Sequence, residues 1–352
     1  MLSTFDPTDR RKLDRDMPSF RSFWPSPLRP AQVEPTFSAS NVPSTLLRFV
    51  LYVSIWDQLY LTFLSILVAG TGMFPIEMQR RIVNAAVTRQ DFHAILTLAA
   101  LYLCLVIAQG LLKLLTNIYR AWVGTNATRL LRLSIGSIPY DEDPNTSVLK
   151  GTKISMIIME ADAVGGFSGD CIAEPVLNVS ILTFVFGYLF YLQPVMALLA
   201  IVIFAIQATF VPTVQRAINQ RVERRISALR QAGADVVNES GTIQASYLNR
   251  FTSVFQLDVG IFDLKYTLNF LMNFAQHMGT IGVIVLGAWF VLNGRIQIGT
   301  VVAFLSGLGS VIDPWGDLIA WYQNYMVTET KYNLISSAIT TFPTEVKASC
   351  TE

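Results

Sequence analysis

Six apolar stretches, separated by polar and basic segments, constrain the fold of this chain more than any other feature. A membrane-spanning helix needs about 20 predominantly apolar residues. The six stretches are residues 59–76, 95–115, 176–192, 195–211, 281–292 and 298–312. The last three are short, so each helix must continue into the amphipathic residues beside it. The pattern predicts an all-α membrane protein that crosses the bilayer six times.

The composition supports lipid as the solvent. Charged residues make up 14% of the chain and hydrophobic residues 52%, whereas a soluble domain averages about 25% charged residues. The formal net charge of +1 offers no basis for binding nucleic acid. Cys104, Cys171 and Cys350 are scattered, and His93 and His277 have no neighbouring ligand pattern, so we expect neither a disulfide framework nor a metal site.

Three segments differ in character along the chain. Residues 1–43 are rich in proline and lack an apolar period, which predicts an irregular N-terminal extension. Residues 44–342 hold the six apolar stretches, and residues 343–352 form a short C-terminal tail. Within the middle segment, residues 44–56 are amphipathic enough to lie along the membrane interface as a first helix.

Basic residues predict the orientation in the membrane. They concentrate in the connections between the second and third stretches and between the fourth and fifth: Arg120, Arg129, Arg132, Lys150, Lys153, Arg216, Arg221, Arg224, Arg225, Arg230, Arg250 and Lys265. The positive-inside rule therefore places both long connections and both termini in the cytoplasm. The connection between the first and second stretches does not fit this assignment, because it also contains basic residues: Arg80, Arg81 and Arg89. We expect an integral, multi-pass protein of the plasma (inner) membrane.

The two long connections are themselves expected to be helical. Val214, Ile218, Val222, Ile226 and Leu229 recur at helical spacing, which extends the fourth span into water by several turns. Residues 118–133 extend the second span in the same way. Each pair of extensions is joined by a short polar elbow, at residues 139–150 and 239–251.

Several short motifs follow one another in a recognisable order. They are Phe74–Ile76 with Arg81–Ala86, Ile138–Asp141, Met159–Val164, Asn238–Ala245 and, most specific of all, Gly294–Phe304 followed by Asp313-Pro314. Over roughly residues 45–342 this order resembles the transmembrane domain of ABC transporters of the exporter type. One departure is that Asn84 stands where that family commonly has aspartate.

The resemblance implies a fold and a mechanism. The fold would be the type 1 ABC exporter transmembrane bundle, with two cytoplasmic coupling elbows that receive motion from an ATPase domain. The docking positions would be Tyr140 and Asp141 at the first elbow, and Ser246, Tyr247 and Leu248 at the second. A second bundle, in a homodimer or heterodimer, and membrane lipids would be the other partners.

The family's nucleotide-binding domain is missing from the sequence. No Gly-x-x-x-x-Gly-Lys-Ser/Thr phosphate loop occurs in the 352 residues, and we find no catalytic residues. We therefore expect no cofactor in this chain, with ATP and Mg on a partner ATPase domain that is a separate chain or was lost by truncation. The alternatives are an ATP-independent carrier and a non-transporting membrane scaffold. Enzymatic activity is expected only together with the ATPase.

Candidate residues for a substrate cavity come from polar groups at membrane depth. Such groups are costly in lipid and often functional. Asn178, Gln207 and Asn273 lie within or beside the apolar stretches and are our candidates.

Overall fold

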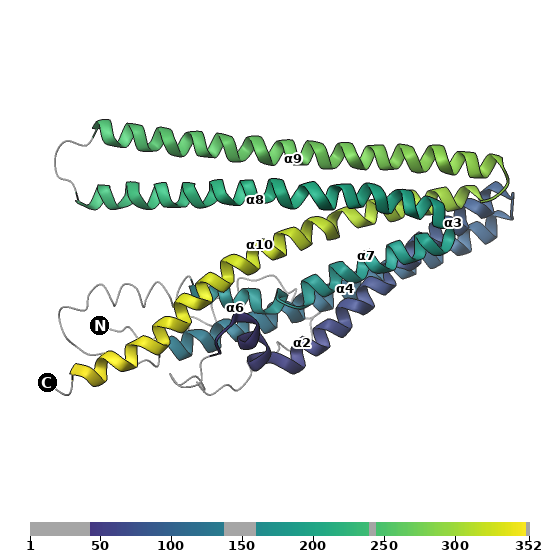
Figure 1. The fold of residues 1–352 in the computed structure, drawn as a ribbon. Coiled ribbons are helices and arrows are strands. Elements are labelled where there is room, and N and C mark those ends of the chain that lie inside the picture. The colour runs from purple at the N-terminus through teal and green to yellow at the C-terminus, as the bar shows by residue number, and fades with distance from the viewer. Residues whose placement is uncertain (1–42, 137–159, 239–243, 350–352) are drawn as a thin grey trace, which may run out of the picture. The chain divides into compact units, whose positions relative to one another are not determined.

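A computed structural model describes residues 43–136, 160–238 and 244–349 (Figure 1). The regular elements in these ranges are helices: α2 Leu46–Thr71, α3 Met73–Val87, α4 Phe92–Gly136, α6 Ala161–Asp170, α7 Ala173–Leu192, α8 Pro194–Asn238, α9 Gln244–Leu292 and α10 Ile298–Ser349. In the described ranges, six helical stretches are long and apolar enough to cross a membrane, with α2–α3 and α6–α7 each counted as one. For these residues, the structure confirms the prediction of an all-helical chain with six helices that are long and apolar enough to span a membrane.

The first span is interrupted twice. Ser54 leaves the helical conformation inside α2 (φ −146°, ψ 40°), and Gly72 separates α2 from α3. The interruption at Ser54 falls inside the segment predicted to lie along the interface, residues 44–56. That segment is therefore continuous with the first span except for a kink.

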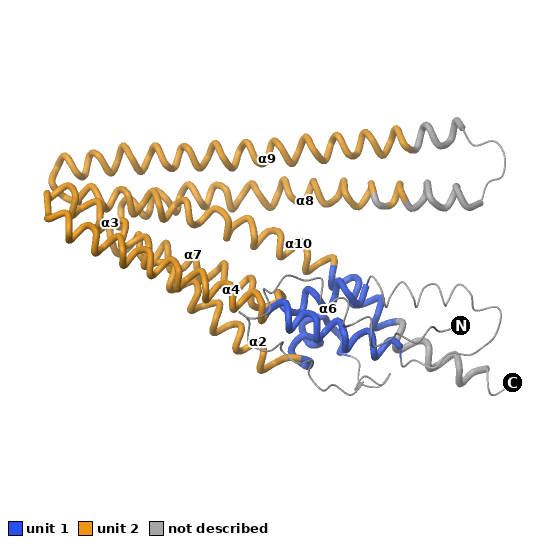
Figure 2. The backbone as a smooth tube through the Cα atoms, turned by 180° about the vertical axis from the view of Figure 1, so that it is seen from behind, with its two compact units in different colours: residues 1–53, 120–169, 328–352 blue, residues 54–119, 170–327 orange. Residues whose placement is uncertain are grey.

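The chain divides into two compact units (Figure 2). Unit 1 contains residues 1–53, 120–169 and 328–352, and unit 2 contains residues 54–119 and 170–327. In unit 1, the second half of α4 packs closely against α6. A Cβ on Gly165 would lie 2.2 Å from Thr128 Oγ1, and one on Gly169 would lie 2.2 Å from the carbonyl oxygen of Arg120. Glycine is what allows the two helices this approach.

Unit 1 also joins the start of α2 to the C-terminal part of α10, from Thr328 onward. The hydroxyl of Tyr332 donates a hydrogen bond of 2.6 Å to the carbonyl of Pro43, and its ring lies 5.3 Å from that of Phe49. Both aromatic side chains are 1% exposed. A buried tyrosine needs a partner for its hydroxyl, and Pro43 supplies it.

The core of unit 2 is built by α3, α7, α8, α9 and α10. Its buried side chains are Ile76, Val185, Leu189, Met196, Ala197, Val283, Phe290, Ala303, Phe304 and Val311. Helix α4 adds little to this core, because none of the residues in its most apolar segment is buried. That surface needs lipid or another protein to cover it.

Helices α8 and α9 form a long antiparallel hairpin, seen side by side in Figures 1 and 2. Its inner face includes Val214, Ile218 and Val222 from α8, packed with Ile261 and Leu268 from α9. The predicted helical stripe beyond the fourth span is thus confirmed for these three residues of α8. The Ile226 side chain lies outside the described part, and Leu229 is 38% exposed.

The helix ends agree only in part with the expected boundaries. Helix α7 ends at Leu192 and α8 begins at Pro194, a position suited to proline because the first helical N–H has no partner in any case.

The first elbow, residues 139–150, lies outside the described residues. In the second elbow the described residues, from Gln244 onward, already belong to α9. Helix α10 continues to Ser349, past the residue 342 at which the sequence suggests a boundary.

Candidate functional site

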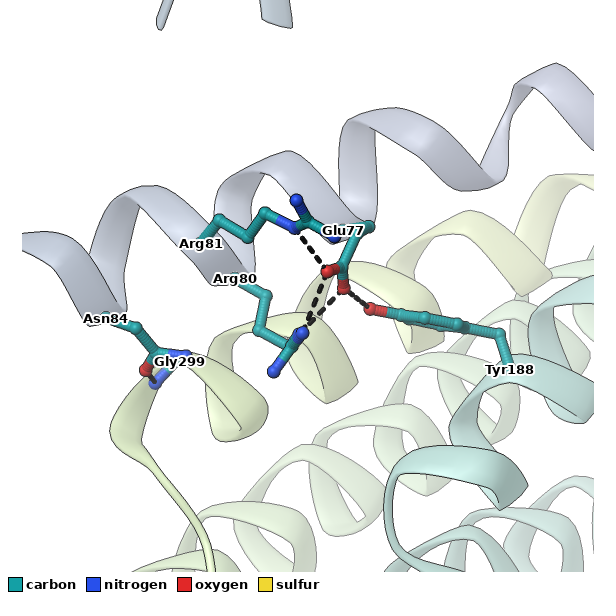
Figure 3. A network of polar contacts seen from close by, with 6 residues as sticks. All are labelled: Glu77, Arg80, Arg81, Asn84, Tyr188 and Gly299. Carbon is teal, nitrogen blue, oxygen red and sulfur yellow. Dashed lines mark hydrogen bonds and ion pairs between the residues drawn. The ribbon is translucent and has the colours of Figure 1, made fainter. Parts of the chain in front are cut away.

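Helix α3 carries a charged cluster near the end of the first span (Figure 3). Glu77 accepts two hydrogen bonds from Arg80, at 2.7 Å from Nε and 2.8 Å from Nη2. It accepts a third, of 2.6 Å, from Nε of Arg81. The spacings of three and four residues place all three side chains on one helix face.

Tyr188 of α7 completes this cluster. Its hydroxyl donates to Oε2 of Glu77, the oxygen that Arg80 Nε also contacts (Figure 3). A carboxylate offers about four lone-pair sites, so three arginine N–H groups and one hydroxyl fill them. The cluster of Glu77, Arg80 and Arg81 carries a formal charge of +1.

Three further polar contacts, made by Asn84 and Gln79, fasten α3 to its neighbours. The side-chain oxygen of Asn84 accepts the backbone N–H of Gly299, at the start of α10, at 2.8 Å. Gln79 accepts a hydrogen bond from the hydroxyl of Ser306 in α10, and its amide nitrogen lies 3.3 Å from the hydroxyl of Tyr102 in α4. Helix α3 is therefore bonded to α4, α7 and α10.

Both helix ends beside this cluster close in the same way. After α3, the N–H of Arg89 donates to the carbonyl of Ala86 and the N–H of Gln90 to that of Ala85. This is a Schellman motif, in which the residue after the helix adopts a left-handed conformation. Here Arg89 does so with φ 53°, while Gly294 has φ 65° at the equivalent place after α9.

An open polar pocket lies against this part of α3. Its volume is about 340 Å³ and it is lined by Arg80, Arg81, Asn84, Ala85, Thr88, Gln90, Leu98 and Gln297. We call it the arginine pocket. From the sequence, Arg80 and Arg81 are exceptions to the positive-inside rule, and Arg81 also begins one of the motifs quoted above, but neither is predicted to line a pocket. The sequence signal that could have revealed the cluster is that Arg80 and Arg81 follow Glu77 by three and four residues, which places them on the same helix face as Glu77.

A second pocket, of about 70 Å³, lies between α8, α9 and α10. We call it the amide pocket; it is lined by Ala200, Ile203, Phe204, Gln207, Met272, Asn273, Gln276, Gly279, Leu308, Val311 and Ile312. Two of the three cavity candidates, Gln207 and Asn273, line it together. The amide nitrogen of Gln207 contacts the carbonyl of Met272 at 3.4 Å.

The other cavity candidate lies elsewhere. Asn178 is buried in α7, 3% exposed, and does not line the amide pocket. Gln276 does line it but was missed in the sequence, although it follows Asn273 by one helical turn. At 1.5 Å per residue, Gln207 lies about 20 Å along α8 from Pro194. If Pro194 lies at a membrane surface, this places Gln207 close to the middle of a bilayer.

The coupling residues predicted from the resemblance are only partly placed. Tyr140 and Asp141 lie outside the described residues, and Ser246, Tyr247 and Leu248 fall in the first turns of α9. Their docking role stays a prediction. Within the described ranges, no three or more His, Cys, Asp or Glu side chains form a group that could hold a metal ion.

No protein-family profile matches this sequence, and no curated protein matches it either.

Proposed function

We propose that this chain is the transmembrane subunit or domain of an ATP-driven exporter of the ABC type. It would form one side of the solute pathway and receive motion from an ATPase domain that lies outside these 352 residues. The α8–α9 hairpin is the observation that carries the proposal.

The hairpin is far longer than a membrane is thick. Helices α8 and α9 contain 45 and 49 residues, which corresponds to lengths of about 68 and 74 Å. A bilayer measures about 40–45 Å including its headgroups. If the ends at Pro194 and Leu292 lie at one membrane surface, roughly 25 Å of hairpin extends beyond the other.

The part of the hairpin farther from Pro194 is cross-linked by polar contacts. Arg225 of α8 forms an ion pair with Asp258 of α9, and Arg221 donates to the carbonyl of Gly260. Together with the packing of Ile218 against α9, these contacts hold the two helices together, and we propose that they move as one body. A rigid hairpin of this kind can transmit a displacement in the cytoplasm to the membrane.

The same part of α9 presents exposed apolar side chains. Phe255 is 67% exposed, Val259 44% and Phe262 50%, with helical spacing that places them on one face. Phe262 lies about 45 Å and Phe255 about 56 Å from Leu292. If Leu292 lies at one membrane surface, both side chains lie at or beyond the other surface of a bilayer about 40–45 Å thick, where lipid tails do not cover them. We propose that a second bundle covers them, either another copy of this chain or a related chain.

The amide pocket supports an amphipathic or lipid-like solute. Apolar side chains from three helices form most of its wall, and Gln207, Asn273 and Gln276 add hydrogen-bonding groups. Its volume of about 70 Å³ accommodates only part of such a molecule. Transport would therefore require a wider state in which α8 and α9 move relative to α10.

The test begins with the coding DNA next to this gene segment. We expect an ATPase reading frame there, with a Gly-x-x-x-x-Gly-Lys-Ser/Thr loop. The chain and that ATPase are then purified together in lipid, and vanadate-sensitive ATP hydrolysis is measured with and without the chain. We expect the chain to stimulate hydrolysis and the joint substitution of Tyr247→Ala and Leu248→Ala to remove the stimulation.

A matched control lies at the opposite end of the same helix. Leu292→Ala alters a side chain that is 86% exposed and should leave the stimulation intact. Solute movement driven by an ion gradient without ATP would instead favour the carrier. If the chain neither changes ATP hydrolysis nor moves solute, the scaffold function replaces the proposal.

A further inference from the structure

We infer that the arginine pocket binds the phosphate of a phospholipid headgroup. Its lining combines two guanidinium groups with amide and hydroxyl side chains, and none of its eight lining residues is acidic. Arginine is well suited to phosphate because its planar group donates two parallel hydrogen bonds. This inference does not depend on the proposed transport function.

The charge of the pocket is only partly neutralised. Glu77 is the carboxylate that pairs with Arg80 and Arg81, and Tyr188 takes another of its lone-pair sites. One negative charge therefore serves two arginines. The side chain of Arg81 is 57% exposed and that of Arg80 24% exposed, so both are accessible to an anion in the pocket.

The uncharged groups are placed to donate as well. The side-chain oxygen of Asn84 already accepts a hydrogen bond from the N–H of Gly299. Its NH₂ group is therefore the group that can donate a hydrogen bond to a ligand. Gln90 and Gln297 provide further amides in the same wall. The volume of about 340 Å³ lies within the range of small-ligand pockets.

The position along the first span matches the headgroup layer. If the first span enters the hydrocarbon at Leu59, where its apolar stretch begins, Arg80 lies about 32 Å farther along the span, just beyond a hydrocarbon core of about 30 Å. The pocket also borders Leu98 of α4. The most apolar window of α4 has no buried residue, so acyl chains can lie along this helix below the headgroup. This apolar surface favours a lipid over free phosphate.

The test measures lipid binding by the purified full chain in detergent. The probe is dioctanoyl phosphatidylglycerol, and its matched control is dioctanoylglycerol, which has the same acyl chains but lacks the phosphate. Native mass spectrometry or a fluorescent-lipid titration gives the affinities. We expect saturable binding of phosphatidylglycerol that is at least about tenfold tighter than that of dioctanoylglycerol, the ratio expected for charge-assisted hydrogen bonds.

Two variants address the pocket itself. Arg81→Gln keeps the contacts between Arg80 and Glu77 and should weaken binding about tenfold. Gln90→Glu places a negative charge on an exposed lining residue, leaves the α3 cluster intact and should also weaken binding. The control is Arg295→Gln, because Arg295 is exposed and packs over the rings of Trp289 and Phe290 outside the pocket.

Three results would count against the inference. Unchanged binding in both pocket variants would overturn it, and so would an equal loss in Arg295→Gln, which would indicate general charge attraction. A third arm adds inorganic phosphate without lipid. If phosphate binds with the same dependence on Arg81 but phosphatidylglycerol does not, the pocket is a site for soluble phosphate and the lipid assignment is wrong.

Discussion

The side-chain oxygen of Asn84 accepts a hydrogen bond of 2.8 Å from the backbone N–H of Gly299, which lies 215 positions later in the chain. Gly299 is in the first turn of α10, where backbone N–H groups have no partner within the helix. A Cβ on Gly299 would lie 2.3 Å from the carbonyl oxygen of Arg80. The side chain of one helix thus caps the start of another, and glycine is what lets them meet.

Replacing Gly299 with alanine should separate α3 from α10. The added methyl group meets the backbone of Arg80, which cannot move aside as a flexible side chain could. We expect a loss of about 1–3 kcal/mol, measured as a lower unfolding temperature in detergent. Gly309→Ala in the same helix, where a Cβ meets nothing within 4 Å, should be neutral or stabilising. Equal unfolding temperatures for the two variants would contradict this account.

Asn84 should tolerate aspartate better than alanine. Aspartate keeps an oxygen acceptor for the N–H of Gly299 and places negative charge at a helix N-terminus, where it is favourable. Alanine removes the acceptor, and loss of a capping side chain costs about 0.5–2 kcal/mol. Thermal unfolding of both variants in detergent measures the difference. An alanine variant as stable as wild type would show that this bond contributes nothing.

Glu77→Gln should destabilise unit 2 more than Tyr188→Phe does. The first change leaves Arg80 and Arg81 without their carboxylate, whereas the second removes one hydrogen bond. The expected losses are on the order of 2 kcal/mol and 1 kcal/mol. A double-mutant cycle of chemical unfolding would show a coupling between the two residues. Independent, additive effects would indicate that the Glu77–Tyr188 bond is not formed in the protein.

Neighbouring glycines of α6 should respond differently to alanine. A Cβ on Gly165 would lie 2.2 Å from Thr128 Oγ1 and 2.3 Å from the Thr128 backbone, but one on Gly166 has nothing within 4 Å. We expect Gly165→Ala to reduce the yield of folded protein on size exclusion, and Gly166→Ala to leave it unchanged. The opposite order would show that α4 and α6 pack on another face.

The exposed stripe on α9 should hold two bundles together. Substituting both Phe255 and Phe262 with serine removes exposed apolar surface from this face of α9. If the chain forms a homodimer, we expect this double variant to shift it toward monomer in light scattering of detergent-purified protein. Phe92→Ser changes a residue that is 74% exposed at the start of α4 and should not. A dimer that is unaffected by the α9 substitutions would show that another surface joins the bundles.

The six apolar helices could be predicted because their signals are local. Helical hydrogen bonds join residues four apart, and hydropathy accumulates along a continuous stretch. For the same reason the apolar repeat of Val214, Ile218 and Val222 predicted the extension of α8 beyond the span, which its residue range confirms. The grouping of Gln207 with Asn273 could not be predicted in this way. The polarity of each residue within an apolar stretch made it a cavity candidate, but only the structure shows that both line one pocket.

Sequence alone determined the class of this protein, the number of apolar helices and the amphipathic character of the long extensions. The tertiary structure alone decided which residues meet: Asn84 with Gly299, Glu77 with Tyr188, and Gly165 rather than Gly166 against Thr128. These contacts depend on the axial register and rotation of helices far apart in the chain. Register and rotation follow from the packing of all the facing side chains at once, and no single segment encodes them.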